Sequence, residues 1–460
     1  MASLCWRILL MALAILQFPY NIKACFFHGD HDHASGSSDL SERSYMPTRN
    51  VSHPGRIRTA FLNVRIFDGY RLHEPGTVLV DDGIIVSNMS HIDILVDGLG
   101  GVLMPGLIDS HCHVGSVDDL EALSSYGVTT ALNMACTSYP MCAALRDQVG
   151  LASFFTAGFP AQGPGSNHAK NMHTPANMLV SSPDQAETFV ENVINNGSDW
   201  LKITAEQNGP DQATQNALVA AAHARGFPTM THAADLPYYK QAILSKTDGV
   251  QHAPADDLLP DDFIALMLKQ GQTSTPTMEL AKIILAQAVT QPDLLTTLGV
   301  GQDASYDVWR SNVVAMHKAG IPILAGTDAP MIPPPPPGSS SSSASSSSSA
   351  PSSSLSAAPS SNSSSTSVNP TANFGWSLHG ELANLVDAEF SPSEALRAAT
   401  LVPAMAHGLL DRGRIAPGLR ADLLLLEPGA QPLRDIRDTL RISRVWIGGI
   451  EYQNVTKSSS

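Results

Sequence analysis

Short apolar segments alternate with helical stretches through the middle of this 460-residue chain. The alternation is typical of parallel βα units, because a crossover helix carries the chain back and lets the next strand run parallel to the last. Eight such units predict an α/β fold, a (β/α)₈ TIM barrel whose last helix covers 392–407 with Ser391 as N-cap. The expected strands are residues 103–109, 129–134, 152–157, 200–204, 228–231, 249–252, 272–276 and 321–325.

Both ends of the chain carry short segments in which apolar and polar residues alternate, the pattern of strands with one buried face. They fall at 60–67, 77–80 and 83–87 and again at 421–426 and 442–447. We therefore expect one small β-sandwich domain that is formed by both termini, with the barrel inserted between its halves. The expected boundaries are 58–102 and 409–456 for the sandwich and 103–332 and 371–408 for the barrel.

The first residues have the pattern of a secretory signal peptide. Arg7 gives a basic start, and residues 8–18 form an apolar stretch that is too short to span a bilayer. Cleavage after Ala24 would remove residues 1–24 and leave a secreted protein without a membrane span; an uncleaved anchor or a buried helix is the alternative. Sequons that fit a secreted glycoprotein occur at Asn50, Asn88, Asn196, Asn362 and Asn454.

Two polar segments have too little apolar surface to form a core. Residues 25–57 are expected to be a disordered leader, although the histidines of 28–33 could bind metal loosely. Residues 333–370, a proline run followed by a serine-rich tract, are expected to be a disordered insertion. This insertion follows the eighth strand, so it would hang from the rim of the barrel as an O-glycosylated flap or a tolerated loop expansion.

Charge and cysteine content narrow the range of partners. A net charge of −15 without a basic patch argues against a nucleic-acid partner, and it leaves the oligomeric state open, a homo-oligomer included. Cys136 and Cys142 flank a short loop and could form a disulfide in an oxidising compartment. Cys112 would point away from its two histidine neighbours, so we interpret it as a packed side chain.

Those neighbours, His111 and His113, stand one residue apart at the end of the first expected strand. Residues i and i+2 of a strand point to the same face, so both imidazoles would leave the strand in one direction. Neutral imidazole is a common ligand of divalent metal ions. Two such histidines alone are more often surface or core residues than metal ligands. Whether this pair binds a metal ion depends on the candidate ligands in the rest of the chain.

Further candidate ligands follow at the ends of later strands. The carboxyl ends of barrel strands converge on the face where such enzymes keep their chemistry. Each residue has a structural alternative, such as a core histidine or a helix-capping aspartate, but their order on regular units makes coincidence improbable. The candidates are Lys202 on the fourth strand, His232 on the fifth, His252 on the sixth and Asp328 on the eighth.

This order of residues resembles the metal-dependent amidohydrolase superfamily. The segments MPGLIDSHCH (104–113) and AGTD (325–328) match its motifs. The segments HGEL (379–382), SPSEALRAAT (391–400) and GRIAPGLRAD (413–422) resemble its imidazolonepropionase-like branch, which includes Xaa-Pro dipeptidases and ochratoxinase-like amidases. The resemblance covers residues 58–452, apart from the Pro/Ser-rich insertion.

The resemblance implies a binuclear centre with two divalent metal ions, zinc by default, although manganese or iron would fit the same ligands. His111, His113 and Asp328 would hold one ion, and His232 and His252 the other. Lys202 would be an N6-carboxylysine that bridges them, since burial favours the neutral amine that reacts with CO₂. A salt-bridged Lys202 would leave a mononuclear site.

The resemblance also implies hydrolysis by a metal-activated hydroxide, with Asp328 as the catalytic residue that takes the proton and passes it to the leaving nitrogen. Substrate contacts are harder to place. The candidates lie in loops, after His232 or after the insertion, where exposed or supporting side chains are the alternative. They are His168, His173, Tyr239 next to Tyr238, and Glu381.

Three functions follow from these residues. The first is a secreted hydrolase that cleaves a carbon–nitrogen bond in a small amide or peptide-like substrate. The second is a metal-dependent lactonase or ring-opening enzyme of secondary metabolism, because the same centre can activate water or an acidic carbon. The third is a catalytically silent secreted metal-binding protein, which the intact ligand set argues against.

Overall fold

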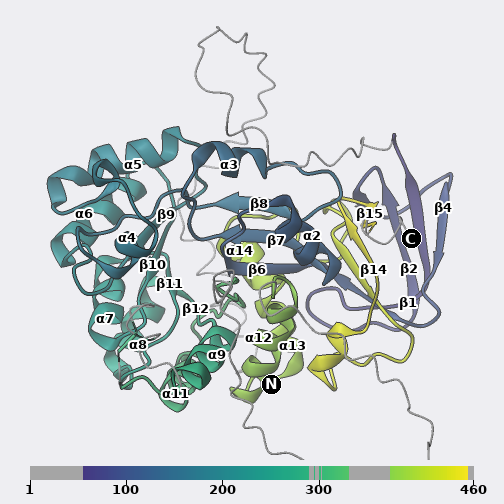
Figure 1. Cartoon of the computed structure of the whole chain (residues 1–460). Helices are drawn as coiled ribbons and strands as arrows, with labels where there is room; N and C mark the ends of the chain where they lie inside the picture. The colour runs from purple at the N-terminus through teal and green to yellow at the C-terminus, as the bar shows by residue number, and fades with distance from the viewer. Residues whose placement is uncertain (1–54, 290–294, 296–299, 302, 331–372, 454–460) are drawn as a thin grey trace, which may run out of the picture.

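The computed structural model describes residues 55–289, 295, 300–301, 303–330 and 373–453 (Figure 1). The expected signal peptide, most of the leader and the insertion at 333–370 lie outside the described residues, as do the sequons at Asn50, Asn362 and Asn454. Asn88 and Asn196 are exposed. Within the described part of the chain, no helix is both long and apolar enough to cross a membrane.

The two ends of the described chain meet in one eight-stranded sheet. The strand order is β15-β14-β13-β5-β1-β2-β3, and β4 pairs with β1 beside β5. The rings of Phe61 and Trp446 lie 4.7 Å apart although two strands separate β1 from β14, so the sheet curls around its own core. Its strands are β1 (Arg58–Ile66), β2 (Gly76–Asp81), β3 (Ile84–Val86), β4 (Ile94–Asp97), β5 (Val102–Pro105), β13 (Leu423–Leu426), β14 (Ile442–Ile447) and β15 (Ile450–Glu451).

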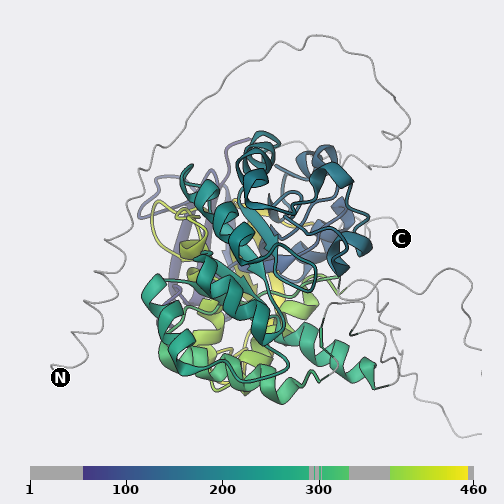
Figure 2. The ribbon, with the colours of Figure 1, turned by 90° about the vertical axis from the view of Figure 1, so that its left-hand side faces the viewer.

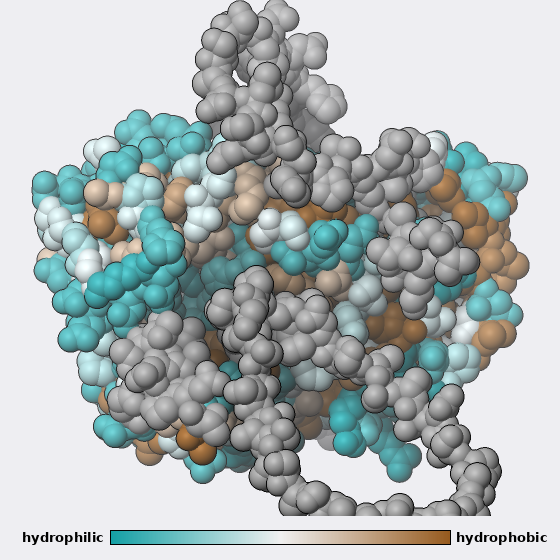
Figure 3. All heavy atoms as spheres, in the orientation of Figure 1, coloured by the Kyte–Doolittle hydropathy of each residue, from teal (hydrophilic) through white to brown (hydrophobic). Residues whose placement is uncertain are grey.

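Strands from both termini thus share a sheet, as expected; the sandwich itself stays a prediction. Exposed apolar side chains gather on this sheet, where Ile84, Ile94 and Leu95 are 41%, 42% and 60% exposed. The brown area over β4 on the right of Figure 3 contrasts with the hydrophilic helices on its left. β13 differs, because its four leucines are buried on both faces.

The middle of the chain forms two parallel sheets, which confirms the α/β class. All strand pairs in them are parallel, and nearly all of their residues are buried, as expected of strands covered on both faces. The first sheet contains β6 (Leu107–Cys112), β7 (Val128–Asn133) and β8 (Ser153–Thr156). The second contains β9 (Leu201–Thr204), β10 (Thr229–His232), β11 (Gly249–Gln251) and β12 (Thr273–Thr275).

Backbone hydrogen bonds link these two sheets through the segment 322–329. Ser274 of β12 donates to the carbonyl of Pro322 at 3.0 Å, and Ser110 of β6 donates to that of Ala325 at 2.9 Å. On the other side, the amide of Ala161 donates to the carbonyl of Lys202 at 2.8 Å. The expected eighth strand therefore lies between β12 and β6 and pairs through isolated bridges.

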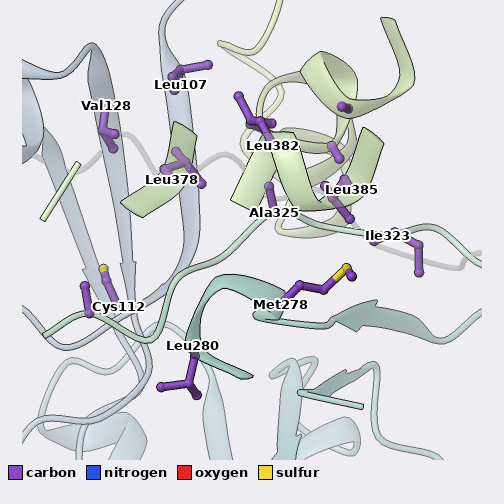
Figure 4. Packing of buried hydrophobic residues seen from close by; sticks show 14 of the residues in the cluster. Leu107, Cys112, Val128, Met278, Leu280, Ile323, Ala325, Leu378, Leu382 and Leu385 are labelled. Carbon is purple, nitrogen blue, oxygen red and sulfur yellow. The ribbon is translucent and has the colours of Figure 1, made fainter. Parts of the chain in front are cut away.

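Helices cover the outer side of β9–β12 (Figures 1 and 2). The expected helix over 392–407 is divided in two, and Ser391 caps the first part with a capping box, as predicted. In Figure 4, Leu378 and Leu382 of α12 lie close to Leu107 of β6. The helices are α2 (Val117–Ser125), α3 (Tyr139–Ala144), α4 (Asn167–Asn171), α5 (Ala186–Asn195), α6 (Gln212–His223), α7 (Leu236–Ser245), α8 (Asp261–Gln270), α9 (Met278–Ala288), α11 (Tyr306–Ala319), α12 (Trp376–Asp387), α13 (Pro392–Ala398) and α14 (Leu401–Ala406).

The expectation of one continuous strand over 103–109 is corrected by the structure, because Gly106 separates two strands, β5 and β6. The amide of Gly106 donates to the carbonyl of Asp422 in the terminal sheet, and the amide of Leu107 donates to that of Gly127 beside β7. One continuous apolar run therefore serves two sheets. A Cβ on Gly106 would meet the Thr129 side chain at 2.3 Å, which explains the glycine at the crossing point.

Gly106→Ala is expected to lower the free energy of unfolding by about 1–3 kcal/mol, because the added methyl group overpacks the contact with Thr129. Thermal unfolding followed by circular dichroism measures this loss. Gly55→Ala is the matched control, since nothing lies within 4 Å of a Cβ at that position. Equal midpoints for the two variants would contradict the proposed crowding.

Candidate metal centre

His111 and His113 leave the end of β6 in the same direction, as the strand periodicity predicts. Their ring centroids lie 5.3 Å apart. The Nε2 atoms of His111 and His113 approach Oδ1 of Asp328 at 3.0 and 2.8 Å. Two neighbouring histidines thus meet at one point with an aspartate that lies 215 residues after His113. Cys112 between them is a free thiol buried in the core.

Two more imidazoles extend this cluster. His232 ends β10 and His252 follows β11, and their ring centroids are 4.5 Å apart. His252 also lies 5.0 Å from His111, ring to ring. One ligand atom each from His111, His252 and Asp328 can be chosen so that all three lie within 4.8 Å of one another, a spacing that suits a single cation.

Lys202 on β9 is only 4% exposed. Burial lowers its pKa to about 7, and the carboxylate of Asp328 acts in the opposite direction. Burial and, to a smaller extent, the charge of Lys202 lower the pKa values of His111, His232 and His252. Within the described residues, no ion pair or hydrogen bond engages Nζ of Lys202. Lys202 is therefore not a salt-bridged lysine within the described residues.

The buried imidazoles are suited to bind a cation. Burial lowers the pKa of His111 to about 3 and those of His232 and His252 well below the ordinary value, so all three are neutral at pH 7. Among the described residues, Nδ1 of His111 and Nε2 of His232 are buried without a hydrogen-bond partner. Lone pairs that are buried and unused beside a carboxylate are the donors of a divalent metal site.

Asp328 is held in place by an aspartate two residues before the first histidine. Oδ2 of Asp109 accepts the hydroxyl of Thr327 at 2.7 Å, and Oδ1 accepts the amides of Thr327 and His111, each at 3.1 Å. Asp328 itself has a left-handed φ of 59°. A Cβ on Gly326 would lie 2.8 Å from the His111 backbone, so only glycine permits this close approach.

The charge state of Asp328 follows from its neighbours. Burial acts to raise its pKa, but His111 and His113 outweigh burial and hold the pKa well below the ordinary value. Asp328 is therefore a carboxylate at neutral pH. It lies within reach of both histidines and can accept a proton beside the place where a cation would bind.

His168 extends the site in a way that only the structure shows. It lies in α4, and its ring is 4.3 Å from that of His232. Nδ1 of His168 is 3.1 Å from Oε1 of Glu206, which also accepts the His168 amide at 3.0 Å. Glu206, 5% exposed, escaped the sequence analysis, because no motif or spacing joins it to His168 across 38 residues.

The other expected substrate contacts are not brought to this cluster. His173 is exposed. The fully buried Tyr239 points into the core, where its hydroxyl lies 3.2 Å from Ser274 Oγ and contacts Met316. Tyr238 is half-buried and packs against the same core cluster, and burial, followed by the charges of Asp235 and Glu206, raises its pKa.

Glu381 is also buried, and it receives the amide of Glu279 at 2.7 Å. It is therefore a support within the protein rather than a substrate contact.

Cys136 and Cys142 form a disulfide in the described structure.

A model of the amidohydrolase family matches residues 102–450. The chain belongs to the amidohydrolase family. An uncharacterized protein of Mycobacterium tuberculosis is 27% identical over 274 residues, which cover 55% of this chain and 70% of that protein. An adenine deaminase of Methanopyrus kandleri is 34% identical over 79 residues, 17% of this chain and 12% of the deaminase. Family membership confirms the predicted enzyme class, a hydrolase that acts on carbon–nitrogen bonds.

Solved structures share the fold. A Xaa-Pro dipeptidase superposes with a TM-score of 0.69 at 18% identity, over 86% of this chain and all of the dipeptidase. Molinate hydrolase gives 0.68 at 20% identity over 88% and 96% of the two chains, and the ochratoxinase of A. niger gives 0.65 at 17% over 87% and 96%. Together with the family match, these likenesses confirm an α/β fold of the TIM-barrel type.

Glu381→Gln is expected to flatten the pH dependence of stability in chelator-treated protein. Burial raises the pKa of Glu381 from 4.5 to about 8. Between these values the folded protein holds a proton that the unfolded chain has released, so the free energy of unfolding falls as pH rises. Glutamine has no such proton. Denaturant titrations from pH 5 to 8, on both proteins, measure the difference; parallel curves would contradict the shift.

Proposed function

We propose that this protein is a secreted, metal-dependent hydrolase that cleaves a carbon–nitrogen bond in a small amide or peptide-like substrate. The observation that carries the proposal is the convergence of four imidazoles, three of them buried and neutral, with the Asp328 carboxylate at the carboxyl ends of parallel strands. Family membership supplies the reaction class, and the electrostatics of the cluster supply the reason for a cation.

The centre would hold two divalent ions, zinc by default. His111, His113 and Asp328 would bind one, and His232 and His252 the other. Carboxylation of Lys202 would provide the bridge: the neutral amine bonds to the carbon of CO₂ and releases a proton, which turns a cationic side chain into an anionic one. The burial of Lys202 among imidazoles and the absence of an ion pair in the described residues support this change of sign.

Bound divalent ions supply a Lewis acid and a water molecule of lowered pKa. The chain's own groups supply the proton transfer. The oxygen of the water bonds to the substrate's carbonyl carbon, and Asp328 accepts the proton that the water releases. Asp328 then delivers this proton to the nitrogen as the carbon–nitrogen bond breaks. His168, fixed by Glu206 beside His232, is placed to hydrogen-bond a polar group of the substrate.

The finer architecture belongs to the same proposal. The hydrogen bonds of 322–329 with β6 and β12, and of Ala161 with β9, support a closed (β/α)₈ barrel. The curled terminal sheet supports a small sandwich.

The Cys136–Cys142 disulfide supports an oxidising compartment and hence secretion. Amino-terminal sequencing of protein recovered from culture medium would begin at Cys25 if residues 1–24 are removed.

A substrate panel tests the function. Zinc-loaded protein is incubated with N-acyl amino acids, dipeptides including X-Pro, and lactones, and the products are separated by chromatography. Release of an amine or amino acid supports the proposal. Turnover of lactones alone would replace it with the ring-opening alternative, and stoichiometric metal without any turnover would favour the silent metal-binding protein.

Asp328→Asn should reduce kcat by at least about 10²-fold, because the amide cannot accept the proton, whereas the histidine ligands still hold metal. Steady-state kinetics and elemental analysis on the same sample separate these effects. Asn63→Asp is a control for a remote amide–carboxylate exchange. A variant that keeps wild-type kcat would remove Asp328 from the proton transfer.

Lys202→Ala should lose at least one metal ion per chain, since the bridging ligand is gone. Wild-type protein that is equilibrated with ¹³C-bicarbonate should show a carbamate carbon signal by NMR, and the variant should lack it. An unchanged metal count, or the same signal in both proteins, would contradict carboxylation of Lys202.

A further inference from the structure

Helix α9 begins without the side-chain cap that its own sequence offers. Thr277 occupies the N-cap position and is of a residue type that readily caps helices. It makes no capping hydrogen bond, however, and its backbone is left-handed, with φ 45° and ψ 51°. The first-turn amides of α9 therefore need an acceptor from elsewhere.

The hydroxyl of Thr277 instead contacts a histidine of the candidate metal centre. Its Oγ1 lies 2.7 Å from Nδ1 of His252. In the tautomer that donates Nδ1–H to this oxygen, Nε2 keeps the lone pair that would bind a metal ion. Thr277 thus holds the rotation of the ring, and where its hydroxyl oxygen accepts from Nδ1–H it also selects this tautomer.

Glu381 of α12 supplies the missing cap. Its Oε2 accepts the amide of Glu279 at 2.7 Å, and a backbone hydrogen bond from Met278 also acts on this carboxyl group. The Glu381 side chain is completely buried, and its Oε1 has no partner among the described residues. Glu381 lies 102 residues after Glu279 in the sequence, and its buried carboxyl group replaces Thr277 as the cap of α9.

The turn between His252 and α9 is held from a third side. Nε1 of Trp309 in α11 donates to the carbonyl of Pro276 at 2.8 Å. The turn is also costly, since Thr277 and His252 both have left-handed backbones, with φ of 45° and 71°. Without the cap from Glu381, Thr277 would be the nearest acceptor for the amides of α9, and its hydroxyl would be drawn away from the ring.

We propose that Glu381 is a positioning residue for the metal centre, which caps α9 in place of Thr277 and so leaves the Thr277 hydroxyl to orient His252. This inference rests on the proposed function only in taking His252 as a metal ligand. Glu381 acts through the amides of α9 and the Thr277 hydroxyl and does not touch the ion or the substrate.

The test compares removal with conservative replacement at both positions. Glu381→Ala and Thr277→Val should each weaken zinc binding about 10- to 100-fold in a competition with a fluorescent chelator. Glu381→Gln and Thr277→Ser, which keep an acceptor and a hydroxyl, should stay within about threefold of wild type. Glu389→Ala is the matched control, because that glutamate is exposed and forms a surface ion pair with Lys318.

A second measurement does not depend on metal loading or activity. Long-range ¹H–¹⁵N NMR of the metal-free protein reports the tautomer of His252. Glu381→Ala and Thr277→Val should change its Nδ1 and Nε2 signals in the same way, and the double variant should add nothing further. This readout survives even if the wild-type protein binds no zinc, a result that would refute the proposed function alone.

Two results would overturn the inference. One is wild-type zinc affinity in a folded Glu381→Ala protein. The other is a loss of affinity in Glu381→Ala with no change in Thr277→Val or in the His252 signals, which would mean that Glu381 acts by another route. If Glu381→Ala does not fold, Glu381→Leu, which keeps more of the side-chain volume but offers no acceptor to the amides of α9, takes its place in both measurements with the same expected changes.

Discussion

The candidate site depends on one buried contact, the carboxylate of Asp109 with the segment that contains Asp328. Three donors from Thr327 and His111 converge on this carboxylate and tie 326–328 to β6. The amide of Asp328 donates in turn to the carbonyl of His111 at 2.6 Å. Because a buried carboxyl group is costly unless it is hydrogen-bonded, any shift of the two segments that broke these three hydrogen bonds would be unfavourable.

Burial does the remaining electrostatic work. Withdrawn from water, His111, His232 and His252 stay neutral and keep lone pairs, whereas an exposed histidine would be partly protonated near neutral pH. The same burial makes a lysine ammonium unfavourable at position 202. A divalent cation would resolve both costs, since it uses the lone pairs and attracts an anionic form of the lysine. The residues are therefore more compatible with one another when a metal is bound than when it is absent.

Periodicity and order predicted much of this arrangement. The spacing of His111 and His113 indicates a shared direction, and candidate ligands at successive strand ends indicate one face of a barrel. What periodicity could not resolve is where one apolar run changes sheets, because Gly106 acts through a contact with Thr129 that no local pattern encodes. The full burial of Tyr239 could not be foreseen for a related reason: a helix begins at Leu236, and its exact phase decides which ring is completely buried.

Residues that support the ligands were the hardest to foresee. Glu206, Thr277 and Glu381 act across 38, 25 and 102 residues; Glu381 was a candidate from the sequence, but no local pattern indicated which groups any of the three would contact. Backbone strain lies in the segments that these hydrogen bonds hold, since His252, Thr277 and Asp328 all have left-handed φ values. Each such residue costs about 1–3 kcal/mol and persists only where its surroundings over-determine it. The hydrogen bonds of Asp109 and Glu381 offset that cost. Two carboxyl groups that are not themselves proposed metal ligands therefore keep the histidine ligands in place.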